Sequence, residues 1–383
     1  MKKSLIALAF GTLGLGISEF VMMGILSDVA NDLHISITEA GHLISAYALG
    51  VCIGAPILVF ARKKSLKNII LILASIIIAG NLAATLAPNY HFLLGARFLS
   101  GLPHGAYFGV GSIIASKLAT RGKKSEAVSI MIAGMTFANL IGVPLGTSLS
   151  LALSWRVVFL LVSLWGIVIL YSIWKWVPQV EGLQDTGFIG QFHFVISPAA
   201  WLLRGATMLC NGGIFCWYSY INPLLAQVSG FPINSITFLM VLSGFGMVIG
   251  NLISGRLSDR FTPARVAASV QGLVCLILLA LFFFSPISWA SVLLMMLCTA
   301  GLFALSSPQQ VLLIQYSKGG ELLGAASVQM AFNLGNAIGA YSGGLVIDAG
   351  YSYQHPALLG VPFALLGFIL LCTFIKRYES KQI

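Results

Sequence analysis

Residues 68–87, NIILILASIIIAGNLAATLA, form a run of 20 residues without one charged side chain. An α-helix rises about 1.5 Å per residue, so a run of this length matches the hydrocarbon core of a bilayer, which is about 30 Å thick. Soluble proteins rarely carry such a run, because their surface must face water. We therefore interpret residues 68–87 as a transmembrane helix.

Comparable apolar runs recur along the whole chain of 383 residues. Hydrophobic residues make up 58% of the sequence and charged residues only 8%, whereas a soluble domain carries about 25% charged residues. The fold class predicted from this pattern is an all-α polytopic membrane protein with about twelve transmembrane helices. We place these helices at residues 5–28, 40–60, 68–87, 92–117, 126–151, 155–177, 199–227, 235–256, 265–284, 289–316, 323–347 and 356–375.

The net charge of +10 is distributed unevenly between the two sides that these spans define. Eighteen of the 21 Lys and Arg residues fall on the side that both termini share, and the opposite side has only Arg97 and Arg156, with Arg204 at a helix entrance. Loops rich in Lys and Arg stay in the cytoplasm. We therefore expect both termini in the cytoplasm and an integral protein of the bacterial inner membrane. This distribution also gives no reason to expect a nucleic-acid partner.

Features of enzymes, metalloproteins and disulfide-stabilised proteins are missing from the sequence. The six cysteines all lie inside predicted spans without paired spacing, which is typical of small apolar packing residues. There is no H-x-x-x-H pair, no phosphate-binding G-x-x-x-x-G-K-[ST] and no nucleophile elbow. We predict no enzyme activity, no cofactor and no metal site.

The two halves of the chain resemble each other. Asn139 to Gly146 and Asn336 to Gly343 share the spacing N-x-x-G-x-x-x-G at an offset of 197 residues. Such an offset predicts two pseudo-symmetric halves of six helices, related by an axis normal to the membrane. The expected domains are residues 1–177 and 198–383. The polar stretch 178–197, which contains Asp185 and His193, is expected to link them in the cytoplasm.

Several motifs resemble those of the major facilitator superfamily. Gly255-Arg-Leu-Ser-Asp259-Arg260 matches the G-x-x-x-D-R motif expected after the eighth helix, and Arg62-Lys63-Lys64 keeps the basic part of its counterpart after the second helix. Arg97-Phe-Leu-Ser-Gly-Leu-Pro-His104-Gly looks like the R-x-x-x-G-x-x-H-G pattern of drug/proton antiporters, especially their arabinose-efflux (AraJ-like) subgroup. Gly142-Val-Pro144-Leu-Gly146 is similar to the antiporter motif of the fifth helix. The resemblance implies a proton-coupled exporter of small molecules.

Charged groups inside a bilayer are expensive, at about 2.5 to 3.5 kcal/mol even on lenient insertion scales, and therefore indicate function. Glu19 is the one acid of eleven that lies deep in a predicted span. The rise per residue places it at a depth between Arg97 and His104. We predict that Glu19, Arg97 and His104 couple transport to protons. Two other interpretations stay open, a Glu19–Arg97 ion pair that only braces the protein and a His104 that only packs.

Small residues four apart form stripes on two helices. Gly134, Ala138, Gly142 and Gly146 share one face of the fifth helix, and Gly335, Gly339 and Gly343 do so in the eleventh, so a neighbouring backbone can approach closely. Static packing and gating are equally good interpretations of the stripes. Residues assigned to gating or helix packing are Gly142, Pro144, Gly146, Gly255, Asp259, Arg260, Gly339 and Gly343.

Polar and aromatic residues in mid-span are candidates for lining a substrate cavity. These candidates are Met23, Tyr107, Asn139, Asn211, Trp217, Gln309 and Asn333. Taken together, the sequence predicts a monomeric proton-coupled transporter that exports a drug-like or other amphiphilic small molecule by alternating access. Its expected partners are that substrate, protons and the lipid bilayer. A sugar or nucleoside exporter is the nearest alternative, and a membrane receptor or assembly protein that has lost transport is a further one.

Overall fold

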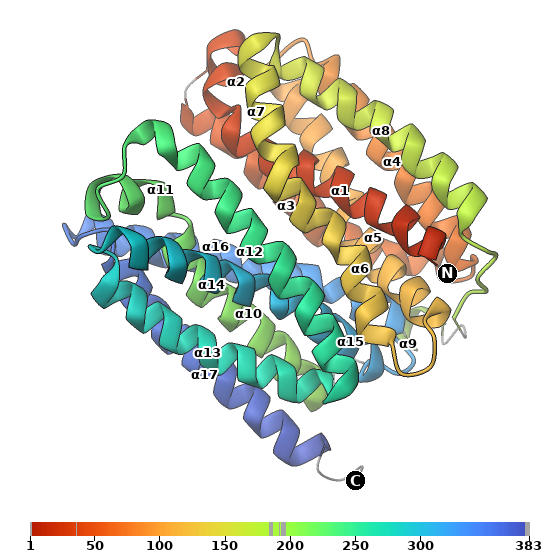
Figure 1. Ribbon diagram of the computed structural model, residues 1–383. Coiled ribbons are helices and arrows are strands. Elements are labelled where there is room, and N and C mark those ends of the chain that lie inside the picture. Colours follow the sequence, from red (N-terminus) through yellow and green to blue (C-terminus); the bar gives the residue numbers. More distant parts are fainter. Residues whose placement is uncertain (1, 36, 184–186, 191, 193–196, 380–383) are drawn as a thin grey trace. The chain divides into compact units, whose positions relative to one another are not determined.

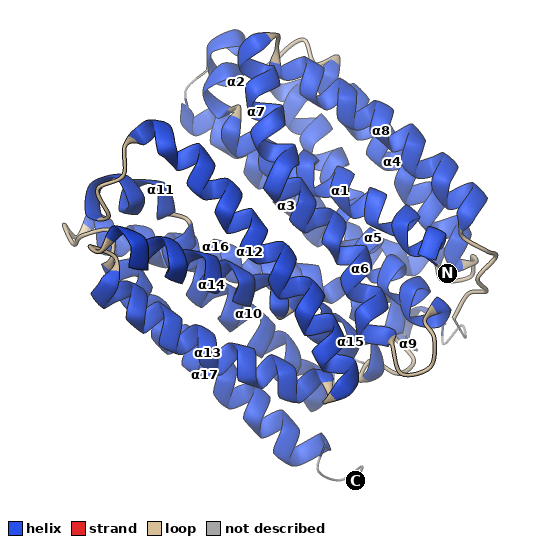
Figure 2. Ribbon diagram, viewed as in Figure 1, coloured by secondary structure: helices blue, strands red, loops and turns tan. Residues whose placement is uncertain are grey.

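The computed structural model describes residues 2–35, 37–183, 187–190, 192 and 197–379. Asp185 and His193, assigned to the linker, lie outside these residues. The described chain consists of helices and loops without a strand (Figure 2). The helices are α1 (Lys2–Gly24), α2 (Leu26–Leu33), α3 (Ile37–Ile57), α4 (Leu66–Thr85), α5 (Tyr90–Leu118), α6 (Lys124–Phe137), α7 (Val143–Ala152), α8 (Trp155–Trp176), α9 (Gly187–Gly190), α10 (Pro198–Tyr218), α11 (Ile221–Pro223), α12 (Ile233–Arg260), α13 (Pro263–Phe284), α14 (Ser288–Ala304), α15 (Ser306–Gln315), α16 (Glu321–Asp348) and α17 (His355–Phe374) (Figure 1).

Each of the twelve predicted spans is helical, and the prediction of an all-α membrane protein is confirmed. Within the described residues, nine helices are both long and apolar enough to cross a membrane. The remaining three spans are α5, α10 and α16, of 29, 21 and 28 residues. These helices are long enough to cross but carry more polar and charged side chains, among them Arg97, Arg204 and Asn333.

Local sequence explains where several helices begin and where two of them change geometry. Ser65, Asn89 and Ser154 cap α4, α5 and α8 by accepting a backbone N–H of the first turn. The fifth span contains a π-helical turn at Ala138–Gly142, which ends two residues before Pro144. Proline has no N–H for the preceding turn, so the backbone relaxes there.

The chain forms two compact units. The first comprises Met1–Phe194 together with Ser317–Met330, and the second comprises Val195–Tyr316 together with Ala331–Ile383. The domains 1–177 and 198–383 stay a prediction, and they differ from the compact units chiefly in the segment Ser317–Met330.

Glycines set the closest helix contacts in the first unit. A Cβ atom added at Gly50 or Gly54 of α3 would collide with the backbone carbonyls of Phe98 or Leu102 of α5, and one at Gly101 would collide with the carbonyl of Tyr47. Only a residue without a side chain allows two backbones to approach this closely. Helices α3 and α5 are therefore held in a fixed register.

The second unit repeats this contact. Added Cβ atoms at Gly246 and Gly250 of α12 would meet the carbonyls of Met296 and Ala300 of α14. Gly50 and Gly54 precede Gly246 and Gly250 by 196 residues. The internal repeat in the sequence thus has a counterpart in the helix contacts within each unit.

The two ends of the first unit differ in charge. At one end the Nζ atom of Lys67 lies 2.8 Å from the carbonyl of Trp174, and that of Lys117 lies 3.4 Å from the carbonyl of Glu181. At the other end Arg156 binds Asp32 and donates to the carbonyl of Ala87 at 3.1 Å. Lys67 and Lys117 therefore lie at the end of the unit near the N-terminus, where Ser4 donates to the carbonyl of Trp176. The side of the membrane on which this end lies stays a prediction.

Candidate functional site

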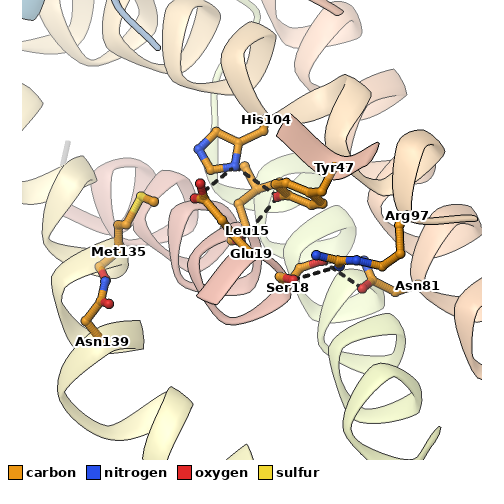
Figure 3. Close-up of polar contacts among 9 residues, drawn as sticks. All are labelled: Leu15, Ser18, Glu19, Tyr47, Asn81, Arg97, His104, Met135 and Asn139. Carbon is orange, nitrogen blue, oxygen red and sulfur yellow. Dashed lines mark hydrogen bonds and ion pairs between the residues drawn. The ribbon is translucent and has the colours of Figure 1, made fainter. Parts of the chain in front are cut away.

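Glu19 lies on α1, five residues before the helix ends at Gly24. Its side chain is 15% exposed, and its Oε2 atom has no hydrogen-bond partner among the described residues. The Nδ1 atom of His104 of α5 is 3.7 Å from Oε2 (Figure 3). This separation is within ion-pair range but longer than a hydrogen bond. The carboxylate is therefore close to the imidazole of His104 without a hydrogen bond to it.

His104 is completely buried and is held by aromatic neighbours. Its ring stacks on Phe108, one turn further along α5, with a centroid distance of 5.1 Å and an interplanar angle of 10°. Its Nδ1 atom is 2.9 Å from the hydroxyl of Tyr47, and its Nε2 atom has no partner in the described structure. Only Nδ1 thus has polar neighbours, and these are Tyr47 and Glu19.

Arg97 is also fully buried, two turns before His104 on α5. Its Nη1 atom donates to the backbone carbonyl of Ser18 at 2.8 Å, and its guanidinium carbon lies 4.5 Å from the centroid of the Tyr47 ring. In the described structure it forms no ion pair with Glu19, and its Nε and Nη2 atoms have no acceptor. A buried guanidinium with two unused donors is costly, and no ion pair with Glu19 offsets that cost among the described residues.

Tyr47 of α3 is the residue of this site that the sequence analysis missed. It is 1% exposed, its hydroxyl contacts His104 and lies 3.4 Å from the carbonyl of Leu15, and its ring faces Arg97. A signal was present, because Tyr47 is the one aromatic residue in the middle of the predicted span 40–60. The register fixed by Gly101 against the backbone of Tyr47 explains why this side chain reaches His104.

Ser18 and Asn81 complete the polar network. The hydroxyl of Ser18 donates to Oδ1 of Asn81 at 2.9 Å, and the amide of Asn81 donates to the carbonyl of Ile77 at 2.8 Å. Ser18 therefore connects α1 to α4 through its side chain and to α5 through its carbonyl (Figure 3). Two further helices thus fix the position of α1 directly beside Glu19.

The arrangement joins a carboxylate, an imidazole, a phenol and a guanidinium in a part of the first unit that is almost completely buried. An ionised carboxylate there loses its hydration, and protonation removes that cost. A proton on Glu19 can be given up when a donor such as Nδ1–H of His104 approaches the carboxylate. The site can therefore hold and release one proton at Glu19.

The other predicted residues of the first unit lie in varied surroundings. Met23 is 55% exposed near the end of α1, and Tyr107 is fully buried with its hydroxyl donating to the carbonyl of Leu8 at 3.3 Å. Asn139 is partly buried in the π-helical turn and donates to the carbonyl of Met135 at 3.0 Å (Figure 3). A substrate contact by any of these residues stays a prediction.

The glycine stripe of the fifth span packs against α1. A Cβ at Gly142 would meet the side chain of Ile17 at 2.5 Å, and one at Gly146 would meet Val21 at 2.5 Å. The stripe therefore makes the close helix contact expected from its spacing. A gating function of Gly142, Pro144 or Gly146 stays a prediction.

In the second unit, Asn211 and Trp217 of α10 are buried, and the Asn211 amide donates to the carbonyl of Thr207 at 2.9 Å. Gln309 of α15 is completely buried, and neither atom of its amide group has a partner among the described residues. Asn333 of α16 is partly buried. A buried amide without partners costs free energy, so Gln309 is the strongest polar candidate of this unit.

The remaining predicted positions of this unit belong to helix packing or to a helix end. Added Cβ atoms at Gly339 and Gly343 would collide with the carbonyls of Gly212 and Cys216 of α10. Gly255 is buried in the last turns of α12, where Asp259 is partly buried and Arg260 is exposed. Their role in gating stays a prediction.

The described residues contain no group of three or more His, Cys, Asp or Glu side chains that could hold a metal ion. All six cysteines are free thiols. The candidate site is thus built from this chain's own titratable groups.

Comparisons with known proteins agree with these observations. Residues 8–328 match the family described as Major Facilitator Superfamily. The protein AraJ of Escherichia coli (strain K12) is 48% identical over 385 residues, covering 100% of this chain and 97% of AraJ. A protein of Helicobacter pylori (strain J99) named "Probable sugar efflux transporter" is 27% identical over 98% of this chain and 95% of its own length.

A solved structure shares the fold. FucP, the fucose:proton symporter of E. coli, superposes with a TM-score of 0.75, at 17% sequence identity and over 97% of this chain and 98% of FucP. At this identity the likeness concerns the architecture of twelve helices in two halves, and it says nothing about the substrate of this chain.

Proposed function

This chain belongs to the Major Facilitator Superfamily, and we propose on that basis that it is a proton-coupled transporter that exports a small molecule across the bacterial inner membrane by alternating access. Glu19 carries the coupling proton, and His104 and Arg97 control when it is held. The observation that carries this proposal is the Glu19 carboxylate itself, which is 3.7 Å from Nδ1 of His104 and has no hydrogen bond at Oε2.

The absence of a closed ion pair between Glu19 and Arg97 in the described part of the chain supports a transport function over a bracing one. A brace needs a closed ion pair, because a charge removed from water is stabilised only by a partner in good geometry. Arg97 instead donates to the carbonyl of Ser18 and leaves two donors unused. A change in the protonation state of Glu19 therefore breaks no ion pair with Arg97 and no hydrogen bond at Oε2 within the described structure.

The transport cycle follows from the cost of charge in the membrane. A proton from outside neutralises Glu19, and the neutral carboxyl is stable in the buried interior of the protein. When Glu19 faces the cytoplasm the proton leaves, and the substrate moves outward in exchange. Proton entry down its gradient thereby supplies the free energy for uphill export.

A drug-like or amphiphilic substrate is our first choice, because Met23, one turn after Glu19 on α1, exposes an apolar side chain. A sugar is the second candidate, since the H. pylori relative is named for sugar efflux and the buried Gln309 amide lacks partners. Amide groups without partners favour a substrate that carries hydroxyls. The decisive measurement is proton movement in proteoliposomes on addition of lipophilic cations, pentoses, hexoses or nucleosides.

Glu19→Gln tests the coupling directly, because glutamine keeps the shape of the side chain but cannot release a proton. We expect the variant to bind substrate and to exchange it downhill, while export driven by a pH gradient falls to background. Glu126→Gln is the matched control, since Glu126 lies in the first turn of α6, 3.6 Å from Lys123. Full gradient-driven export by a folded Glu19→Gln protein would show that the proton is carried elsewhere.

A further inference from the structure

The hydroxyl of Tyr47, which also has the Ser18 side chain as a neighbour, has two groups within hydrogen-bond distance to which it can donate its proton. It lies 2.9 Å from Nδ1 of His104 and 3.4 Å from the backbone carbonyl of Leu15. A phenol has one O–H to donate, so it donates either to the carbonyl or to the imidazole. The choice determines whether Nδ1 carries a proton.

Two hydrogen-bonding patterns result. If Tyr47 donates to Leu15, its oxygen accepts from Nδ1–H of His104, and this N–H is also the group that lies 3.7 Å from the carboxylate of Glu19. If Tyr47 donates to Nδ1, the proton of the imidazole is on Nε2, which has no partner in the described structure. The first pattern offers a donor to Glu19 and the second does not.

We propose that Tyr47 is a positioning residue for the proton on Glu19: by exchanging its hydrogen bond between Leu15 and His104, it sets the tautomer of His104 and so controls how strongly the ionised carboxylate is held. This inference rests on the proposed proton coupling at Glu19. The titratable and charged groups that face Tyr47 are Glu19 from α1 and Arg97 and His104 from α5. Because Nδ1–H is shared between the phenol and the carboxylate, the ionised form of Glu19 receives this donor only part of the time.

Removing the Tyr47 hydroxyl should shift the midpoint of the pH dependence of transport in one direction. In Tyr47→Phe, Nδ1–H has only the carboxylate to bind, and a hydrogen bond to an ionised acceptor is about twice as strong as one between neutral groups. The ionised form of Glu19 gains, so the midpoint of the pH dependence of transport should move to lower pH by roughly half to one unit. When 3-fluorotyrosine replaces Tyr47, the hydroxyl is a better donor and a poorer acceptor. It should therefore favour donation to Nδ1 of His104, which leaves Glu19 without the Nδ1–H donor, so the midpoint should move to higher pH.

Tyr107→Phe is the matched control for the loss of a buried hydroxyl. Tyr107 is as buried as Tyr47, and its hydroxyl donates to the carbonyl of Leu8, two turns before Leu15 on α1. Both phenylalanine variants should lose similar thermal stability. Whatever Tyr107→Phe does to the rate, its midpoint should be that of the wild type, and only Tyr47→Phe should displace it.

The experiment is the pH profile of substrate-driven proton movement in proteoliposomes for the wild type, the two phenylalanine variants, the 3-fluorotyrosine protein and His104→Gln with and without Tyr47→Phe. In the His104→Gln background Tyr47→Phe should cause no further shift. A wild-type midpoint in both folded position-47 variants, or additive shifts in the double mutant, would overturn the positioning role while leaving coupling at Glu19 intact. Should Tyr47→Phe fail to fold, the fluorinated protein alone decides. A wild type that moves no protons would instead refute the proposed function, and the positioning role with it.

Discussion

Gly101→Ala should disturb the candidate site without altering any of its side chains. Gly101 of α5 faces the backbone of Tyr47, and a Cβ added there would lie 3.0 Å from the carbonyl carbon, 3.2 Å from Cα and closer still to the carbonyl oxygen. The obstacle is backbone and cannot rotate away. Helix α3 must therefore move from α5 by roughly 1 Å to restore an ordinary carbon–oxygen separation of about 3.3 Å.

The expected magnitude follows from three contributions. Alanine in place of glycine favours the helix by about 1 kcal/mol. Overpacking costs about 1–3 kcal/mol, and the hydrogen bond between Tyr47 and His104, now 2.9 Å, would be stretched beyond bonding range at a cost of about 1 kcal/mol. Gly95→Ala on the same helix is the control, because its Cβ would meet nothing within 4 Å. The two variants should differ by roughly 2 to 4 kcal/mol, less the local relaxation of α3.

Thermal unfolding in detergent, followed by gradient-driven transport, measures both consequences. Gly95→Ala should melt at or slightly above the wild-type temperature and transport normally. Gly101→Ala should melt several degrees lower and should show an altered pH dependence, since Tyr47 no longer holds Nδ1 of His104. A Gly101→Ala protein that is as stable as Gly95→Ala would refute the close contact between α3 and α5.

Two further predictions concern the ends of the first unit. Asp32 lies outside the spans, and the hydrogen bond from Arg156 lowers its pKa. The ionised carboxylate therefore stabilises the folded protein fully above the ordinary aspartate pKa. This contribution disappears as the pH falls through the lowered pKa of the folded state. Because both side chains are partly exposed, Asp32→Asn should lower the stability at pH 7 by no more than about 1 kcal/mol. The variant should also show a weaker fall of the melting temperature at acidic pH. An unchanged fall would contradict the pairing of Asp32 with Arg156. With both termini inside, cysteine labels at Lys64 and Lys124 should react only from the cytoplasm and a label at Asn31 only from outside, whereas periplasmic labelling of position 124 would reverse the topology.

The sequence by itself determined the class of the protein and most of its chemistry. Twelve apolar runs, one offset between two halves and a lopsided distribution of Lys and Arg are one-dimensional properties, because the thickness of the bilayer imposes a length on each helix and the membrane potential imposes a side on each loop. The same reasoning selected Glu19, Arg97 and His104, since a charge or an imidazole inside an apolar run stands out without knowledge of the fold. Depth along a helix follows from the rise per residue, so the similar depth of Glu19 and His104 could be predicted from the sequence.

Only the tertiary structure decided which faces of these helices meet. Rotation about a helix axis depends on the contacts with its neighbours, and here it is set by close backbone approaches such as that of Gly101 to Tyr47. That contact brings Tyr47 to His104, and the fold gives Arg97 the carbonyl of Ser18 as its partner in place of Glu19. A backbone carbonyl carries no signal in the sequence, because every residue has one. The sequence therefore names the groups that can hold a proton, and the packing of α1, α3 and α5 determines which of them share it.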